Sequence, residues 1–199
     1  MNVRHKILVG VLAALAVMAV TPAKAQTTAY APGQGAPNQI TLNIPVRASV
    51  GGRCGFATAP SGTYNQPNFD VNGLLNDFTF QLDCTGPSRV AVVSANGGLT
   101  IAGAAPVGYA NLAPYDVTLN LVGASETVNA TCEVATLTSG ASCSFVGPVS
   151  TAQGLRLNST SVNQTGSYLR VSAPAYTAAN TLIAGAYADT LTVTVSAAP

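Results

Sequence analysis

The stretch Ala184-Gly-Ala-Tyr-Ala-Asp-Thr-Leu-Thr-Val-Thr-Val195 decides the fold class, because large and small side chains alternate along it. One phase of this alternation holds Tyr187, Asp189, Leu191, Val193 and Val195. A period of two residues is typical of a β-strand with one buried face. The same reasoning predicts strands over residues 40–50, 78–84, 89–94, 115–122 and 168–172.

The spaces between these strands carry turn signals, of which Asn96-Gly97-Gly98 is the clearest. No window gives a helical repeat over ten or more residues. Many short strands separated by turns favour an all-β antiparallel sandwich. A transmembrane barrel fits less well, because such barrels need aromatic girdles and aromatic residues make up only 6% of the chain.

The first 25 residues have the pattern of a secretory signal. A basic start is followed by an apolar run over residues 7–20 and by Ala23-Lys-Ala25, an A-x-A cleavage site. We therefore expect cleavage between Ala25 and Gln26. Residues 26–39 contain Pro and Gly without a period and are predicted to form a flexible leader. Residues 40–199 are then expected to form one exported domain.

Four cysteines follow the leader: Cys54, Cys84, Cys132 and Cys143. An even number in an exported chain predicts two disulfides, although three connectivities are possible. We favour Cys54–Cys84 and Cys132–Cys143, with the second pair bridging a hairpin near residues 137–140. Zinc fits poorly, because no C-x-x-C spacing is present.

Composition argues against most catalytic and nucleic-acid functions. After residue 25 the sequence has no His and no Lys, so the usual general bases and imidazole metal ligands are missing. Five arginines against seven acidic residues form no basic patch for nucleic acid. The sequence predicts no catalytic residues, no metal and no cofactor, and is typical of a protein that assembles.

Several motifs in order resemble the spore coat protein U family, which includes pilins of the archaic chaperone–usher pathway. They are the alternating strand before Cys54-Gly-Phe56, then Gly62-Thr-Tyr-Asn65, Phe80-Gln-Leu-Asp-Cys84, Leu119-Asn-Leu121 and the closing 184–195 stretch. The resemblance covers roughly residues 40–195. Two features depart from it: the middle of the chain lacks an aromatic-rich segment with Trp, and the Cys132–Cys143 pair is extra.

The resemblance implies an immunoglobulin-like sandwich that lacks its last strand. A periplasmic chaperone would fill the gap first, and the N-terminal strand of another pilin subunit, delivered at an outer-membrane usher, would replace it. The chain would then be a structural subunit of a surface pilus that supports adhesion and biofilm formation. The expected donor residues are Ile40, Leu42, Ile44 and Val46, and the expected acceptor edge holds Tyr187, Leu191, Val193 and Val195.

Two alternatives stay open. Residues 40–50 also fit the first strand of their own domain, or a segment in which 40–46 donate and 47–54 begin the home sandwich. Pro45 cannot donate a ladder hydrogen bond, which places any such strand at an edge or beside a defect. The second alternative for function is a self-contained exported β-sandwich that binds carbohydrate or coats a surface.

Overall fold

The structure is a computed structural model that describes residues 45–49, 51–138, 140–150 and 152–198. The chain divides into two units, Met1–Ala48 and Ser49–Pro199. The predicted signal, the Ala25–Gln26 cleavage site, the leader over 26–39, and Ile40, Leu42 and Ile44 lie outside the described residues. Residues 45–49 are exposed and belong to no strand, and Val46 is 89% exposed.

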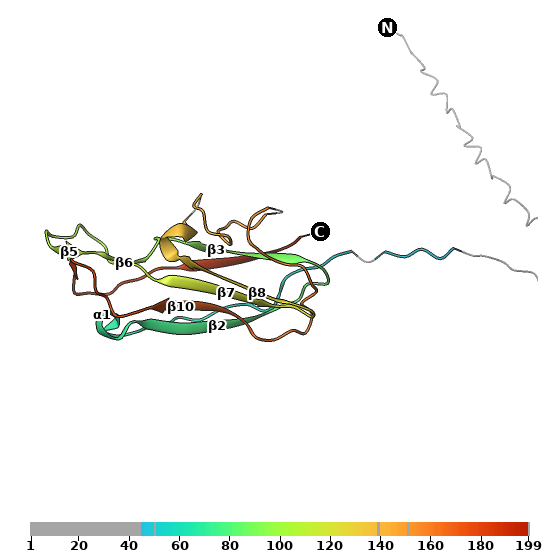
Figure 1. Ribbon diagram of the computed structural model, residues 1–199, viewed down its shortest axis with the longest axis horizontal. Helices are drawn as coiled ribbons and strands as arrows, with labels where there is room; N and C mark the ends of the chain where they lie inside the picture. The colour runs from blue at the N-terminus through green and yellow to red at the C-terminus, as the bar shows by residue number, and fades with distance from the viewer. Residues whose placement is uncertain (1–44, 50, 139, 151, 199) are drawn as a thin grey trace, which may run out of the picture. The chain divides into compact units, whose positions relative to one another are not determined.

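The regular structure of the second unit consists almost entirely of β-strands, which confirms the predicted all-β class (Figure 1). One antiparallel sheet has the order β1 (Phe56–Thr58), β2 (Leu74–Leu82), β10 (Ser167–Ala173), β7 (Asp116–Val122) and β8 (Thr127–Glu133). A second has the order β12 (Leu191–Ala197), β3 (Ser88–Ser94) and β9 (Leu155–Leu157).

Two small pairs complete the sheets. Strand β4 (Leu99–Thr100) pairs antiparallel with β6 (Leu112–Ala113), and β5 (Tyr109–Ala110) pairs parallel with β11 (Thr181–Leu182). The helical elements are α1 (Phe69–Asn72) and the 3-10 helix η1 (Val134–Leu137). Among the described residues, no helix has the length and apolar character needed to cross a membrane.

The hydrophobic core lies between the two larger sheets. Strands β2, β7 and β10 face it from one side, and β3 and β9 from the other. Its fully buried residues include Leu82, Val90, Val92, Val117, Leu119, Leu121 and Leu157. Inward residues alternate with outward ones along β2, β7 and β10, as a period of two residues requires.

Four predicted strands are found, and one is shifted. Residues 78–84, 89–94, 115–122 and 168–172 correspond to β2, β3, β7 and β10. The predicted strand over 184–195 is instead β12, which begins only at Leu191. Before it, Ala188 forms an isolated bridge with Thr100, and the side chain of Asp189 accepts a hydrogen bond from the backbone N–H of Thr190 (2.7 Å), so Tyr187 lies before the strand.

The two disulfides are the favoured pairs, Cys54–Cys84 and Cys132–Cys143. Such bonds are typical of an oxidising, exported environment. The hairpin predicted between Cys132 and Cys143 is wrong, because η1 follows β8 directly and Cys143 belongs to no strand. The chain forms η1 here because Val134 and Leu137 lie three residues apart, on one face of the helical turn, and both are fully buried.

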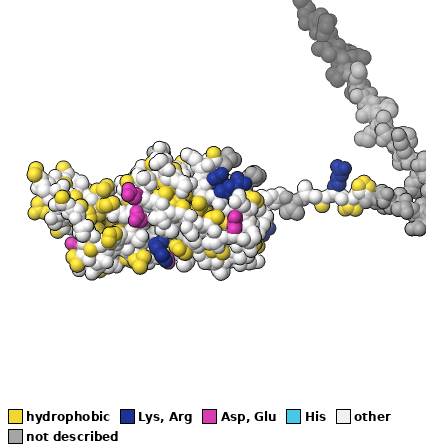
Figure 2. Space-filling model, viewed as in Figure 1, with side chains coloured by type: hydrophobic (Ala, Val, Ile, Leu, Met, Phe, Trp, Pro, Cys, Tyr) yellow, Lys and Arg dark blue, Asp and Glu magenta, His cyan; other side chains and the backbone are white. Residues whose placement is uncertain are grey.

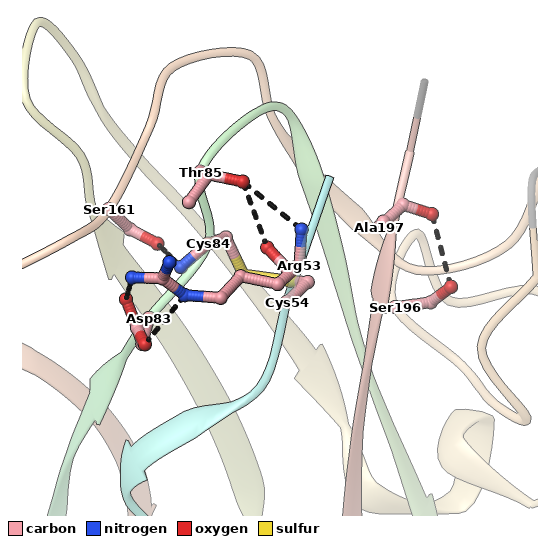
Figure 3. The surroundings of a disulfide bond; sticks show 8 residues. All are labelled: Arg53, Cys54, Asp83, Cys84, Thr85, Ser161, Ser196 and Ala197. Atoms are coloured by element: carbon pink, nitrogen blue, oxygen red, sulfur yellow. Dashed lines mark hydrogen bonds and ion pairs between the residues drawn. A yellow bond between two sulfur atoms is a disulfide. The ribbon is translucent and has the colours of Figure 1, made fainter. Parts of the chain in front are cut away.

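Figure 3 shows the surroundings of the Cys54–Cys84 bond. The backbone N–H of Thr85 donates to the carbonyl of Arg53 (3.0 Å), and the Arg53 guanidinium reaches the Asp83 carboxylate (3.3 Å). The buried hydroxyl of Ser161 accepts from the N–H of Cys84 (3.2 Å). These contacts fix the chain where it enters the second unit.

Candidate functional site

An open cavity of about 640 Å³ lies beside β12, and we call it the groove. Its apolar lining comes from both sheets. Strands β2 and β10 contribute Leu74, Phe78, Leu169 and Val171, and β12 contributes Leu191 and Val193. The groove therefore opens directly into the hydrophobic core.

Burial along β2 locates the incomplete part of this core. Phe80 and Leu82, at one end of the strand, are 4% and 1% exposed. Leu74 and Phe78 point to the same face near the other end but are only half-buried. Leu191 and Val193 of β12 are half-buried too. Apolar side chains on the inner face of a sheet are normally covered, so the groove marks the place where cover is missing.

The edge of β12 that faces away from β3 is unpaired within the described part of the chain. The hydrogen bonds from Ala95 N to Thr190 O (3.0 Å) and from Ala198 N to Pro87 O (2.9 Å) fix the pattern of the ladder. In an antiparallel pair, bonded residues alternate with non-bonded ones. Even-numbered residues of β12 therefore bond to β3.

The odd-numbered residues of β12 consequently direct their N–H and C=O groups to the free edge. They are Leu191, Val193 and Val195, and their side chains also face the core. The same three residues thus present apolar side chains to the interior and unpaired backbone groups to the edge. Such an edge is a template for another strand.

A polar cluster closes the groove at the start of β12. The Asp189 carboxylate accepts hydrogen bonds from the hydroxyls of Ser94 and Tyr115, each at 2.7 Å, and from the N–H groups of Asn96 (3.1 Å) and Thr190 (2.7 Å). Burial and this carboxylate raise the pKa of the Tyr115 hydroxyl. The cluster ties β12 to both sheets, which makes this end of the groove rigid.

The remaining wall is the segment over residues 60–68, which has no helix or strand, together with Phe69 at the start of α1. The Tyr64 hydroxyl donates to Gln66 Oε1 (3.0 Å) and accepts from the N–H of Leu75 (3.3 Å), which holds the segment against β2. The Phe69 ring packs edge-on against the Tyr187 ring, with 5.5 Å between centroids. This wall supplies amide side chains, whereas the floor of the groove is apolar.

The structure brings only part of the predicted edge set together. Leu191, Val193 and Tyr187 line the groove, whereas Val195 packs against the core outside it. The Tyr187 hydroxyl lies 3.0 Å from the carbonyls of Ala110 and Ile183. Sequence reasoning missed the floor residues of β2 and β10. Alternation placed Phe78 on one face of its strand but did not show that this face lies opposite β12, and Leu74 precedes the predicted strand.

Outside the groove, the exposed apolar residues of this unit include Val107, Tyr109 and Leu112, around β5 and β6. Figure 2 shows apolar side chains gathered at that end, and few charged ones on the face in view. Within the described ranges, no three His, Cys, Asp or Glu side chains come together as a metal site would require.

Comparisons with protein-family models, with curated proteins and with solved structures give no match.

Proposed function

We propose that this chain is a structural subunit of a surface fibre and that its groove accepts a β-strand from another subunit. The observation that carries this proposal is the coincidence, on Leu191 and Val193, of half-buried apolar side chains with unpaired backbone groups. A strand laid along β12 would satisfy the backbone and cover the side chains together. This is the β-strand addition mode of recognition.

The occupant that we propose is the segment around Ile40, Leu42, Ile44 and Val46 of another copy or of a related pilin. It has an apolar side chain at every second residue. A strand that covers an open core needs this pattern, because alternate side chains point to the same face. An apolar cavity of about 150 Å³ holds one benzene-sized group. The groove, at about 640 Å³, is of a size to take about four such groups.

With this occupant, the fold becomes an immunoglobulin-like sandwich completed in trans. Each subunit would fill one groove and offer another, and such head-to-tail contacts do not close on themselves but generate a filament. A periplasmic chaperone would cover the groove before assembly and an outer-membrane usher would mediate exchange. Adhesion and biofilm formation would be the role of the fibre. These steps rest on the resemblance given above.

The test is a pair of neighbouring substitutions on β12. Val193→Arg puts a charge into the groove, whereas Thr192→Arg puts the same charge on the outward phase. The exported chain is purified and its assembly is followed by size-exclusion chromatography and electron microscopy. We expect V193R to abolish fibres and T192R to retain them, with both variants folded by circular dichroism. Equal assembly by the two variants would contradict the proposal.

A second candidate is a carbohydrate-binding domain, which the polar wall of the groove favours. Asn65, Gln66 and Asn68 line that wall, and Tyr64, Tyr115 and Tyr187 are also among the lining residues. Pockets of roughly 300–1,000 Å³ suit small ligands. Deleting residues 26–46 separates the two functions. A fibre subunit loses assembly, whereas a binding domain remains a folded monomer that retains its ligand.

A further inference from the structure

We propose that Pro45 sets the direction in which residues 40–46 can add to β12, and thereby sends this segment to a second copy of the chain rather than to its own groove. This inference rests on the proposed function and specifies its partner. It follows from three features: the phase of the free backbone groups on β12, the phase of Pro45, and the place where the chain enters the domain.

The first step concerns antiparallel addition. Directly opposite residues in an antiparallel pair point to the same face and exchange both hydrogen bonds where they are a bonded pair. The free groups of β12 belong to the inward residues Leu191, Val193 and Val195. They would therefore bond to the inward residues of the added strand, Ile40, Leu42, Ile44 and Val46. Pro45 lies in the other phase, so its missing N–H would face away from β12.

Parallel addition reverses this result. In a parallel pair, the N–H and C=O of one residue bond to the two residues that flank its opposite neighbour. The free groups of Val193 would then require bonds from outward residues of the added strand. Pro45 is an outward residue and has no N–H to donate. One carbonyl of β12 would stay unpaired as the added strand covers the core. This lowers the equilibrium constant for parallel addition by roughly tenfold or more.

Topology connects direction to partner. Arg53 accepts a hydrogen bond from Thr85, and Ala198 of the strand end donates one to nearby Pro87. Figure 3 shows Arg53 and Cys54 in the same view as Ser196 and Ala197. The chain thus enters the domain at the C-terminal end of β12. A segment that folds back into its own groove over a short connection would run parallel to β12.

Antiparallel insertion into the same copy leaves too little chain. Residue 46 would lie beside the start of β12, and residues 47–53 would have to return along its whole length to Cys54. Seven residues in β12 span about 20 Å at the rise of a strand. Seven fully extended residues reach at most about 25 Å, so almost no chain length remains for the turn that would reverse the direction of the chain. A second copy imposes no such limit.

The experiment uses the exported chain with cysteines on the outward phase. Thr41→Cys is combined with Ser196→Cys, which it would approach in antiparallel addition, or with Thr192→Cys, which it would approach in parallel addition. With Pro45 present, we expect a ladder of cross-linked chains from T41C/S196C and little product from T41C/T192C. With Pro45→Ala, we expect T41C/T192C to give a cross-link within one chain, increased about tenfold.

Two further variants test the phase itself. Asn43→Pro adds a proline in the same phase as Pro45, and we expect it to keep the ladder. Ile44→Pro puts one in the bonding phase and should abolish the ladder, whereas Ile44→Ala should only weaken it. Identical cross-links with and without Pro45 would overturn the inference while leaving the fibre proposal intact. If T41C/S196C gave no ladder even with Pro45 and Val193 both intact, the fibre proposal itself would be overturned.

Discussion

The carboxylate of Asp189, just before β12, accepts a hydrogen bond from the hydroxyl of Tyr115, just before β7, with 2.7 Å between the two oxygens. Tyr115 is 6% exposed, so the bond is shielded from water. It joins the strand with the free edge to the opposite sheet. This contact therefore fixes the start of β12 relative to the opposite sheet. At that end, the groove stays open without an added strand.

We expect Tyr115→Phe to lower the free energy of unfolding by about 1–2 kcal/mol, because it removes one hydrogen bond to a charged acceptor. The structure gives the hydroxyl of Tyr168, on β10, no hydrogen bond to another described residue, so Tyr168→Phe is the matched control and should change stability by less than about 0.5 kcal/mol. Urea unfolding at pH 7 measures both. Equal effects would show that the Asp189 contact contributes nothing.

The same pair predicts a dependence on alkaline pH. The pKa of Tyr115 is raised in the folded state by burial and by Asp189. As pH rises, the Tyr115 hydroxyl therefore loses its proton in the unfolded chain, at about pH 10, before it does so in the folded chain. The stabilisation from Tyr115 is complete below that pH and declines above it. The advantage of the native chain over Y115F should therefore shrink as pH rises above about 10, as urea midpoints would reveal.

Truncation at the two ends of β2 should have unequal effects. Leu82 is 1% exposed, so Leu82→Ala is expected to cost about 2–5 kcal/mol. Leu74 is half-buried in the groove, and Leu74→Ala should cost the isolated subunit about 1 kcal/mol or less. In assembled fibres we expect L74A to speed subunit dissociation, because the added strand would bury that side chain. Similar unfolding midpoints for both variants would argue against an open groove.

The two disulfides should differ in their contribution to stability. Cys54 and Cys84 are 30 residues apart, and Cys132 and Cys143 are 11 apart. A longer closed loop restricts the unfolded chain more, so C54S/C84S should cost about 3.5 kcal/mol and C132S/C143S about 3 kcal/mol. Thermal unfolding of both double variants measures the order. A larger loss for C132S/C143S would show that native packing around η1 outweighs loop entropy.

The exposed ion pair between Asp77 of β2 and Arg170 of β10 predicts acid sensitivity. The Arg170 guanidinium donates two hydrogen bonds to the carboxylate, at 2.6 and 2.7 Å, and lowers the pKa of Asp77 from its ordinary value of 3.8. The stabilisation is therefore present above about pH 4 and is lost as pH falls through the lowered pKa. In urea unfolding, the advantage of the native chain over Asp77→Asn should therefore shrink as pH falls below about 4, and 1 M salt should narrow the difference at pH 7.

Alternation in the sequence was sufficient to find the strands whose inward residues are large. Phe78, Phe80 and Leu82 identify β2, and Val117, Leu119 and Leu121 identify β7. Strand β8 has the same period, but its inward residues include Ala130 and Cys132, whose small side chains give a weak signal. Strands β4, β5, β6 and β11 have two residues each and exist only through their partners.

The groove could be predicted on one side only. Leu191 and Val193 were found because they share a phase in one strand. Leu74 and Phe78 became part of the site because β2 lies near the edge of one sheet and β12 forms the edge of the other. Strand order is a long-range property, and a period within one strand does not contain it. The late start of β12 also depends on Asp189 and its partners Ser94 and Tyr115, which are distant in sequence.

The Cys54–Cys84 bond has a mechanical consequence. Tension applied through the linker before Arg53 reaches Cys54 and passes across the sulfur bridge to Cys84. Strands β1 and β2 and helix α1, which lie between these cysteines, are left outside the load path. A pulling force that would otherwise separate β1 from β2 is carried by a covalent bond toward the start of β3. The domain can therefore bear load through its linker without unfolding from that side.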